Sequence, residues 1–116
     1  MGTGGVHELA LMECLVETVL DHTAGSQVRV IHLEIGELAG VDVAALRFSF
    51  GVCVEGTPLA GSELDIVRIP GRARCRTCGH EERAASLAAA CRCGSFDRAL
   101  TSGDELRLAN VEVTDV

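Results

Sequence analysis

Two closely spaced cysteine pairs constrain this chain more than any other feature. Cys75 and Cys78 are separated by two residues, and Cys91 and Cys93 follow soon after them. Zn²⁺ binds four thiolates tetrahedrally at about 2.3 Å, and a Cys-x-x-Cys turn places two sulfurs on one metal without strain. Disulfides are the competing interpretation, but they need an oxidising compartment. The spacing therefore predicts a structural zinc site.

The second cysteine pair is tighter than a usual zinc-binding turn. Cys91 and Cys93 have one residue between them, and Ala90 stands where the first cysteine of a Cys-x-x-Cys pair would fall. The residues alone therefore leave the fourth ligand open. It is Cys91, the nearby His80 or a solvent molecule.

The core has to be aliphatic. Of the 116 residues 47% are hydrophobic, but only 3% are aromatic, and Trp and Tyr are absent. Leu, Val, Ile and Ala must therefore fill the interior, and a small core of this kind gains stability from a metal staple.

Charge is distributed unevenly along the chain. The segment 68–98 carries seven Arg against three acids, a balance of +4, whereas the remainder carries three Arg against fourteen acids, a balance of −11. Two surfaces with different partners would explain this pattern, and ordinary solvated faces explain it equally well. Because the whole chain is acidic, we expect no nucleic-acid partner of the kind that binds through phosphate neutralisation.

The first apolar run of the sequence does not have the pattern of a targeting or membrane-spanning segment. It extends from Leu9 to Leu20 and is interrupted by Glu13 and Glu17. Neither a signal peptide nor a membrane span tolerates that pattern well. We therefore expect a cytoplasmic protein, without membrane association, whose thiols are reduced and free to bind metal.

Apolar periodicity predicts the regular elements. It indicates helices over 8–22 and 43–55, and strands over 28–36, 63–69 and 106–113. Asp42 has the position and chemistry of an N-cap for the second helix. Cys14 and Cys53 fall among apolar residues in the two helices, so we expect both to be core residues.

The order of these elements predicts an α+β fold. Two helices pack on a three-stranded sheet, and the cysteine-rich segment is inserted between the second and third strands. The corresponding domains are 6–69 with 103–116, and an inserted module over 70–102.

A histidine–glutamate pair precedes the first predicted helix. His7 and Glu8 offer nitrogen and oxygen donors, which suit Ni²⁺ or Cu²⁺. The alternative makes Glu8 a first-turn acid favoured by the helix dipole and His7 a solvated residue. The residues alone favour the alternative, because one dipeptide carries little information. No catalytic motif is recognisable, so we expect no enzyme.

Several motifs taken in order resemble the HypA/HybF family of hydrogenase-maturation nickel metallochaperones. They are His7-Glu8, Leu33-Glu34-Ile35-Gly36-Glu37-Leu38, Cys75-x-x-Cys78-Gly79-His80, Cys93-Gly94-Ser95 and Ser102-Gly103-Asp104-Glu105-Leu106. The resemblance extends from His7 to Val113. It implies a small nickel-binding domain carrying an inserted four-cysteine zinc module, with zinc on Cys75, Cys78, Cys91 and Cys93.

The resemblance also implies a nickel site and a set of partners. Nickel is bound by His7, with Glu8 and Asp42 contributing, and is delivered to the large subunit of [NiFe]-hydrogenase. The expected partners are a HypB-type maturation GTPase and, in some members, urease accessory proteins. The chain itself is expected to be a monomer or a homodimer.

The N-terminus departs from the family pattern. Members of the family generally begin Met-His-Glu, whereas here Val6 stands in the Met position behind five further residues. We hypothesise that Val6 is the genuine start, or that Met1 to Gly5 is a cloning remnant. With the extension in place, we expect the α-amine to reach its family position beside His7 only if the extension folds back as a loop.

Three functional interpretations follow from the sequence. The first is a nickel metallochaperone with a structural zinc module. The second is a zinc-ribbon interaction or regulatory module without nickel delivery, whose Arg-rich face could contact nucleic acid. The third places iron in the four-thiolate site for electron transfer.

Overall fold

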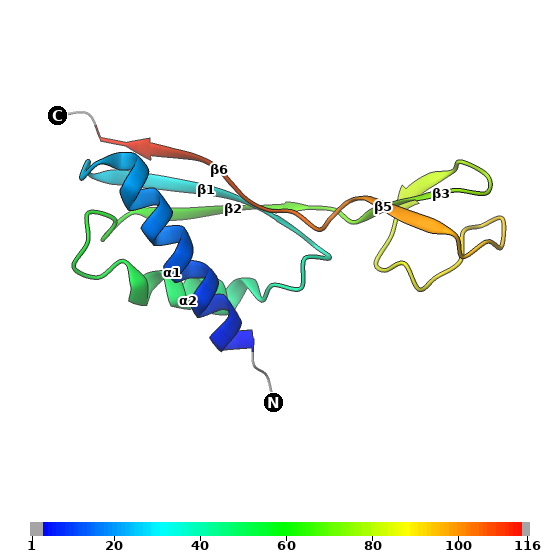
Figure 1. Cartoon of the computed structure of the whole chain (residues 1–116), viewed down its shortest axis with the longest axis horizontal. Helices are drawn as coiled ribbons and strands as arrows, with labels where there is room; N and C mark the ends of the chain where they lie inside the picture. Colours follow the sequence, from blue (N-terminus) through cyan, green and yellow to red (C-terminus); the bar gives the residue numbers. More distant parts are fainter. Residues whose placement is uncertain (1–3, 115–116) are drawn as a thin grey trace. The chain divides into compact units, whose positions relative to one another are not determined.

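The computed structural model describes residues 4–114, with side chains from His7 onward. The elements of this part of the chain, shown in Figure 1, are helices α1 (Gly4–Thr23) and α2 (Val43–Cys53) and strands β1 (Val28–Gly36), β2 (Glu63–Ile69), β3 (Arg72–Cys75), β4 (Glu81–Arg83), β5 (Arg98–Ser102) and β6 (Leu106–Val113). The strands form two sheets, in the orders β2-β1-β6 and β4-β3-β5. The predicted α+β class, with two helices and a three-stranded sheet, is confirmed.

The contacts divide the chain into two compact units. The first comprises residues up to Leu33, Val41–Ile66 and residues from Leu108 onward, and the second comprises Glu34–Gly40 and Val67–Arg107. The predicted domains, 6–69 with 103–116 and 70–102, stay a prediction, because compactness alone does not test whether a segment folds and binds metal as a domain.

Helix α1 begins earlier than the sequence indicated. It starts at Gly4, so the predicted start at residue 8 is wrong and His7 lies within the helix. Extending an existing helix adds one backbone hydrogen bond per residue, and this gain offsets the low propensity of the glycines. The question of whether Met1 or Val6 is the true start involves residues outside those described.

Helix α2 begins where its cap predicts. Asp42 adopts an extended backbone conformation, and its Oδ1 accepts a hydrogen bond from the Ala45 backbone nitrogen at 3.2 Å. The helix ends at Cys53, two residues before the predicted end, and the Val54 N–H closes it by donating to the Phe50 carbonyl. Asp42 is therefore fixed by the backbone it caps.

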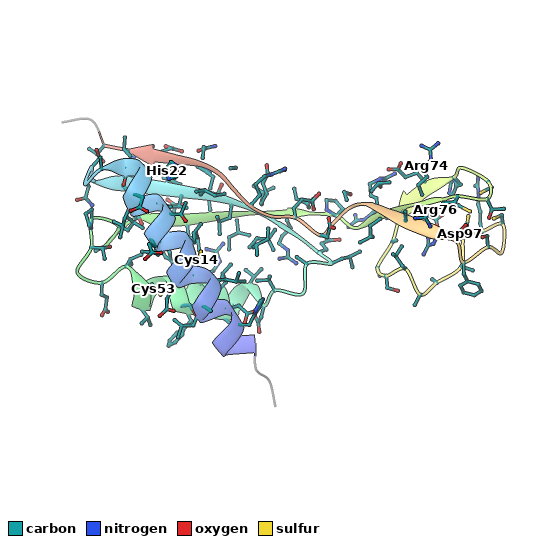
Figure 2. All side chains as sticks on the ribbon, viewed as in Figure 1. Cys14, His22, Cys53, Arg74, Arg76 and Asp97 are labelled. Atoms are coloured by element: carbon teal, nitrogen blue, oxygen red, sulfur yellow. The ribbon has the colours of Figure 1, made fainter. Side chains whose placement is uncertain are left out.

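The core of the first unit is almost entirely aliphatic, as the composition predicts. Helices α1 and α2 pack against each other. The buried apolar residues of this unit are Met12, Val16, Val19, Val28, Val30, Ile31, Leu33, Leu46, Phe50, Val54, Leu59 and Leu64. Cys14 is exposed and Cys53 is only half-buried, so the prediction that both are core residues is wrong (Figure 2). The apolar neighbours of Cys14 in the sequence occupy other faces of the helix.

Three glycines in the second unit allow backbones to touch. A Cβ added at Gly36 would lie 1.9 Å from the Gly103 carbonyl oxygen, and one at Gly71 would lie 2.4 Å from the Ala84 oxygen. Two short hydrogen bonds cross the same junction: Gly36 N–H to Glu105 at 2.8 Å and Leu38 N–H to Gly103 at 2.7 Å. The strands leading to and from the cysteine segment are thus joined backbone to backbone.

Over residues 4–114, neither helix combines the length and the apolar character that a membrane crossing demands.

Candidate metal centres

The first cysteine pair is held by a turn after β3. Cys75 ends the strand, and its sulfur accepts a hydrogen bond from the Cys78 backbone nitrogen at 3.4 Å. Gly79 donates its N–H to the Cys75 carbonyl at 2.9 Å and has a φ of +78°. Glycine suits this position because a left-handed backbone costs it little. The turn therefore directs both sulfurs to one side.

The second pair forms a comparable turn despite its tighter spacing. The Gly94 N–H donates to the Cys91 carbonyl at 2.8 Å, and the Cys91 N–H donates to the Ser95 carbonyl at 2.8 Å. Gly94 is also left-handed, with a φ of +92°. A glycine follows each pair directly and completes its turn, which explains how Cys91-x-Cys93 presents two sulfurs together.

The four sulfurs meet in one cluster. All lie within 4.8 Å of one another, with Sγ–Sγ distances of 3.7 Å between Cys75 and Cys93 and 3.6 Å between Cys78 and Cys91. Tetrahedral zinc with bonds of about 2.3 Å places its sulfurs about 3.8 Å apart. The thiols are free, not disulfide-bonded. The donor set and its spacing therefore fit a zinc ion.

His80 does not belong to this cluster. Its Nε2 lies 2.9 Å from Glu82 Oε1, and the cluster consists of the four cysteines. Of the two protein candidates for the fourth position, the geometry thus brings Cys91 to the others and leaves His80 in hydrogen-bonding contact with Glu82. Which groups bind the metal stays a prediction.

Electrostatics favour metal binding at Cys75. Several hydrogen bonds to the Cys75 sulfur lower the pKa of this thiol to about 6, and the bond from the backbone N–H of Cys78 has the largest effect. Burial acts in the opposite direction and raises the pKa. Thiolate is the form that binds metal. Cys75 and Cys91 are buried and Cys78 and Cys93 exposed, so the cluster is open to solvent on one side.

Much of the positive charge of the cysteine segment is paired locally. Arg76 Nη1 lies 2.7 Å from Asp97 Oδ1, and both residues are visible in Figure 2. Arg72 pairs with Glu81 at 3.1 Å. These pairs reduce the uncompensated charge available to a phosphate backbone, which weakens the zinc-ribbon interpretation with its arginine face on nucleic acid.

Glu8, in the first turns of α1, and Asp42, the N-cap of α2, form a second group of residues of metal-binding type. Glu8 is only 1% exposed, and its Oε2 accepts a hydrogen bond from the Asp42 backbone nitrogen at 2.8 Å. Its other oxygen, Oε1, is buried and accepts no hydrogen bond from the described part of the chain. A buried carboxylate oxygen without a partner is unfavourable.

The structure brings together only part of the predicted nickel set. The Glu8 carboxylate accepts a hydrogen bond from the Asp42 backbone nitrogen. His7 directly precedes Glu8 in the sequence, and its side chain is exposed. Within residues 7–114, the three do not form a cluster as tight as that of the cysteines. The burial of Glu8 was not predicted from the sequence. Its only sequence indication was that Glu8 directly precedes the apolar residues of α1.

The chain is similar in sequence and in fold to known proteins. Residues 6–113 match the model of a family described as "Hydrogenase/urease nickel incorporation, metallochaperone, hypA". Curated relatives include hydrogenase maturation factors HypA from Nostoc punctiforme, 37% identical over 96% of this chain and 98% of the relative, and from Trichormus variabilis, 39% identical with the same coverage. The solution structure of the Ni metallochaperone HypA from Helicobacter pylori is similar in fold, with a TM-score of 0.62 and 22% identity, covering 91% of this chain and 96% of that one.

Proposed function

The chain belongs to the HypA family of nickel-incorporation metallochaperones for hydrogenase maturation, and we propose that it binds Ni²⁺ reversibly near the start of α1. The family is one of metallochaperones and not of enzymes. Our proposal concerns the residues that hold each metal and the proteins that receive nickel.

The buried carboxylate of Glu8 carries the proposal. Its Oε1 has no hydrogen-bond partner in residues 4–114, and a cation beside it would relieve the cost of burying that oxygen. His7 directly precedes it and offers an exposed imidazole, and Asp42 adds a carboxylate held by its capping role. Nitrogen and oxygen donors of this kind suit Ni²⁺. We assign nickel to His7, Glu8 and Asp42.

A site of few donors, one of them exposed, suits a carrier that must release its metal. His7 lies at the surface, so a receiving protein has direct access to it. An imidazole must be neutral to bind metal, so lower pH favours release. We infer delivery to the large subunit of [NiFe]-hydrogenase, in cooperation with a HypB-type GTPase, in the cytoplasm. Urease accessory proteins are further candidate recipients, and the chain acts as a monomer or homodimer.

We assign Zn²⁺ to Cys75, Cys78, Cys91 and Cys93. When bound, zinc supplies a structural crosslink and no redox chemistry. The four thiols hold the turns after β3 and before β5 together, and the N–H groups that point at Cys75 favour its thiolate. Zinc binding in this segment therefore stabilises the second unit.

Calorimetric titration of Ni²⁺ into the zinc-loaded chain tests the nickel site. We expect wild type to bind and His7→Ala to lose most of the binding heat. His22→Ala is the matched control, because His22 is also an exposed α1 histidine, with its Nδ1 at 2.8 Å from the Thr18 carbonyl oxygen. Equal binding by His7→Ala and wild type would reject the assignment and leave a zinc module without this nickel site.

A further inference from the structure

The surface of the two helices carries exposed apolar side chains that the metal sites do not use. Phe48 is 76% exposed and Val52 is 52% exposed, and they lie one turn apart on α2. Leu9 of α1 is 37% exposed. Exposed apolar residues gathered in one place mark interaction surfaces more often than isolated ones do.

These residues line two adjoining hollows between the helices. The larger, about 480 Å³, includes Leu9, Val16, Leu20 and Val52 in its lining. The smaller, about 220 Å³, is lined in part by Leu9, Phe48 and Val52. Leu9 and Val52 belong to both. We call the surface formed by Leu9, Val16, Leu20, Phe48 and Val52 the helix groove.

Acidic side chains border the helix groove. Glu13 and Glu17 line the larger hollow, are exposed, and lie one turn apart on α1. No Arg or His lines either hollow, and the ion pairs found among residues 7–114 do not involve these two glutamates. Like charges at this spacing disfavour a helix, and a cationic partner relieves that repulsion.

Cys53 also lines the larger hollow, but it does not make the groove a reactive thiol site. Burial, and then the charge of Glu13, raise the pKa of the Cys53 thiol, so it stays neutral and weakly nucleophilic. The groove therefore has the chemistry of a docking surface.

We propose that the helix groove binds an amphipathic helix of a partner protein whose apolar face is flanked by Arg or Lys. An apolar groove between two helices accepts a third helix through side chains spaced three and four residues apart. Basic flanks would meet Glu13 and Glu17. A second copy of this chain is a poor occupant, because it would bring the same two glutamates to the interface.

The proposal is independent of nickel binding, although the two surfaces adjoin. Leu9 directly follows Glu8 in α1, so a docked helix reaches the end of α1 that carries the proposed nickel donors. Docking and metal binding are measured separately, so failure of one leaves the other standing.

Fluorescence anisotropy with a labelled designed peptide tests the proposal on the full zinc-loaded chain. The peptide has ~18 residues, about five helical turns, with Leu on one face and Arg on the other. A second peptide replaces each Arg with Glu. We expect the basic peptide to bind at least about ten-fold more tightly at about 50 mM salt, with the ratio shrinking at higher salt.

Two variants address the groove itself. Phe48→Asn with Val52→Asn should weaken binding of the basic peptide by about ten-fold or more, because both side chains supply apolar contact. Glu13→Arg with Glu17→Arg should abolish the preference for the basic peptide. All four positions are on the surface, and circular dichroism checks that the helices are retained.

Matched controls lie outside the groove. Phe96→Asn removes an aromatic side chain that is 69% exposed in the second unit, and Glu63→Arg reverses an exposed charge on β2. Each should change affinity by less than about two-fold. Equal binding of the two peptides by wild type, or unchanged binding by the groove variants, would overturn the proposal. A homodimer that disappears in the Phe48/Val52 variant would overturn it too, in favour of a second copy as occupant.

Discussion

Substitution of Gly36 by Ala tests the backbone junction of the second unit. The added Cβ would lie 1.9 Å from the Gly103 oxygen and 2.1 Å from its carbonyl carbon, whereas real Cβ atoms essentially never come within 3.0 Å of another heavy atom. The two backbones must therefore separate by about 1 Å. No flexible side chain is available to move aside, because the atoms in contact belong to the backbone.

The cost follows from the hydrogen bonds that cross the junction. Separation by about 1 Å lengthens the bonds Gly36–Glu105 (2.8 Å) and Leu38–Gly103 (2.7 Å) beyond hydrogen-bonding range. Each buried group left without a partner costs about 1–3 kcal/mol. Alanine recovers about 0.4–1 kcal/mol by restricting the unfolded chain. We expect Gly36→Ala to lower the free energy of unfolding by about 2–4 kcal/mol.

Urea denaturation of the zinc-loaded protein, followed by circular dichroism, measures this effect. Fluorescence is unsuitable because Trp and Tyr are absent. Gly51→Ala is the matched control: a Cβ there meets nothing within 4 Å, and the residue lies inside α2. We expect it to stabilise by about 0.5–1 kcal/mol. If Gly36→Ala proved as stable as wild type, the argument from backbone contact would be refuted.

Three further predictions concern individual side chains. Cys91→Ser should weaken zinc binding more than about 100-fold, because losing a metal ligand costs more than losing a residue that only hydrogen-bonds to a ligand. Cys14→Ser, which replaces an exposed cysteine, should leave zinc binding unchanged. A chelator competition assay measures both affinities. Nickel affinity of the zinc-loaded chain should fall as pH is lowered, and a pH-independent calorimetric titration would speak against an imidazole ligand. His32 donates from Nδ1 to Asp65 at 2.8 Å and from Nε2 to Glu112 at 2.5 Å, which only the imidazolium can do. These bonds, that to Glu112 foremost, raise the pKa of His32, so its stabilising contribution is complete below about pH 6.5 and is lost as pH rises through the folded-state pKa. His32→Gln should therefore be less stable than wild type at pH 6, with a smaller difference at pH 9; a constant difference in urea midpoint would contradict this.

The long strands could be predicted from the sequence because their signals are local. The strands expected over 28–36, 63–69 and 106–113 coincide with β1, β2 and β6. Each combines apolar or β-branched alternation with Gly, Pro or Ser at its ends. The cap at Asp42 was equally local, since an N-cap depends on a single side chain and the next few backbone groups.

The short strands of the cysteine segment could not be predicted in the same way. Strands β3, β4 and β5 are only three to five residues long, and β3 and β4 are rich in charged residues, so the three show little apolar alternation. Their pairing arises from the turns that gather the cysteines. Arg74 opposes Glu81 in β4 and Ala99 in β5, a register that no local pattern encodes.

The candidate sites differ in how much the sequence revealed. Spacing alone predicted a cysteine metal site but left its fourth ligand open between Cys91, His80 and solvent, and the structure gathers all four thiols within 4.8 Å of one another. The contact between Glu8 and Asp42 joins residues far apart in the chain, and it was expected only from the family resemblance. The bridge from His32 to Asp65 and Glu112 was missed, because it depends on which strands are neighbours and in which register.

X-ray absorption at the zinc and nickel edges, on one sample loaded with one equivalent of each metal, tests the two-site account most directly. We predict four sulfur neighbours at about 2.3 Å around zinc. Around nickel we predict nitrogen and oxygen neighbours only, including imidazole, with the imidazole signal absent in His7→Ala. Sulfur in the nickel shell, or a nickel spectrum unchanged in His7→Ala, would contradict the account.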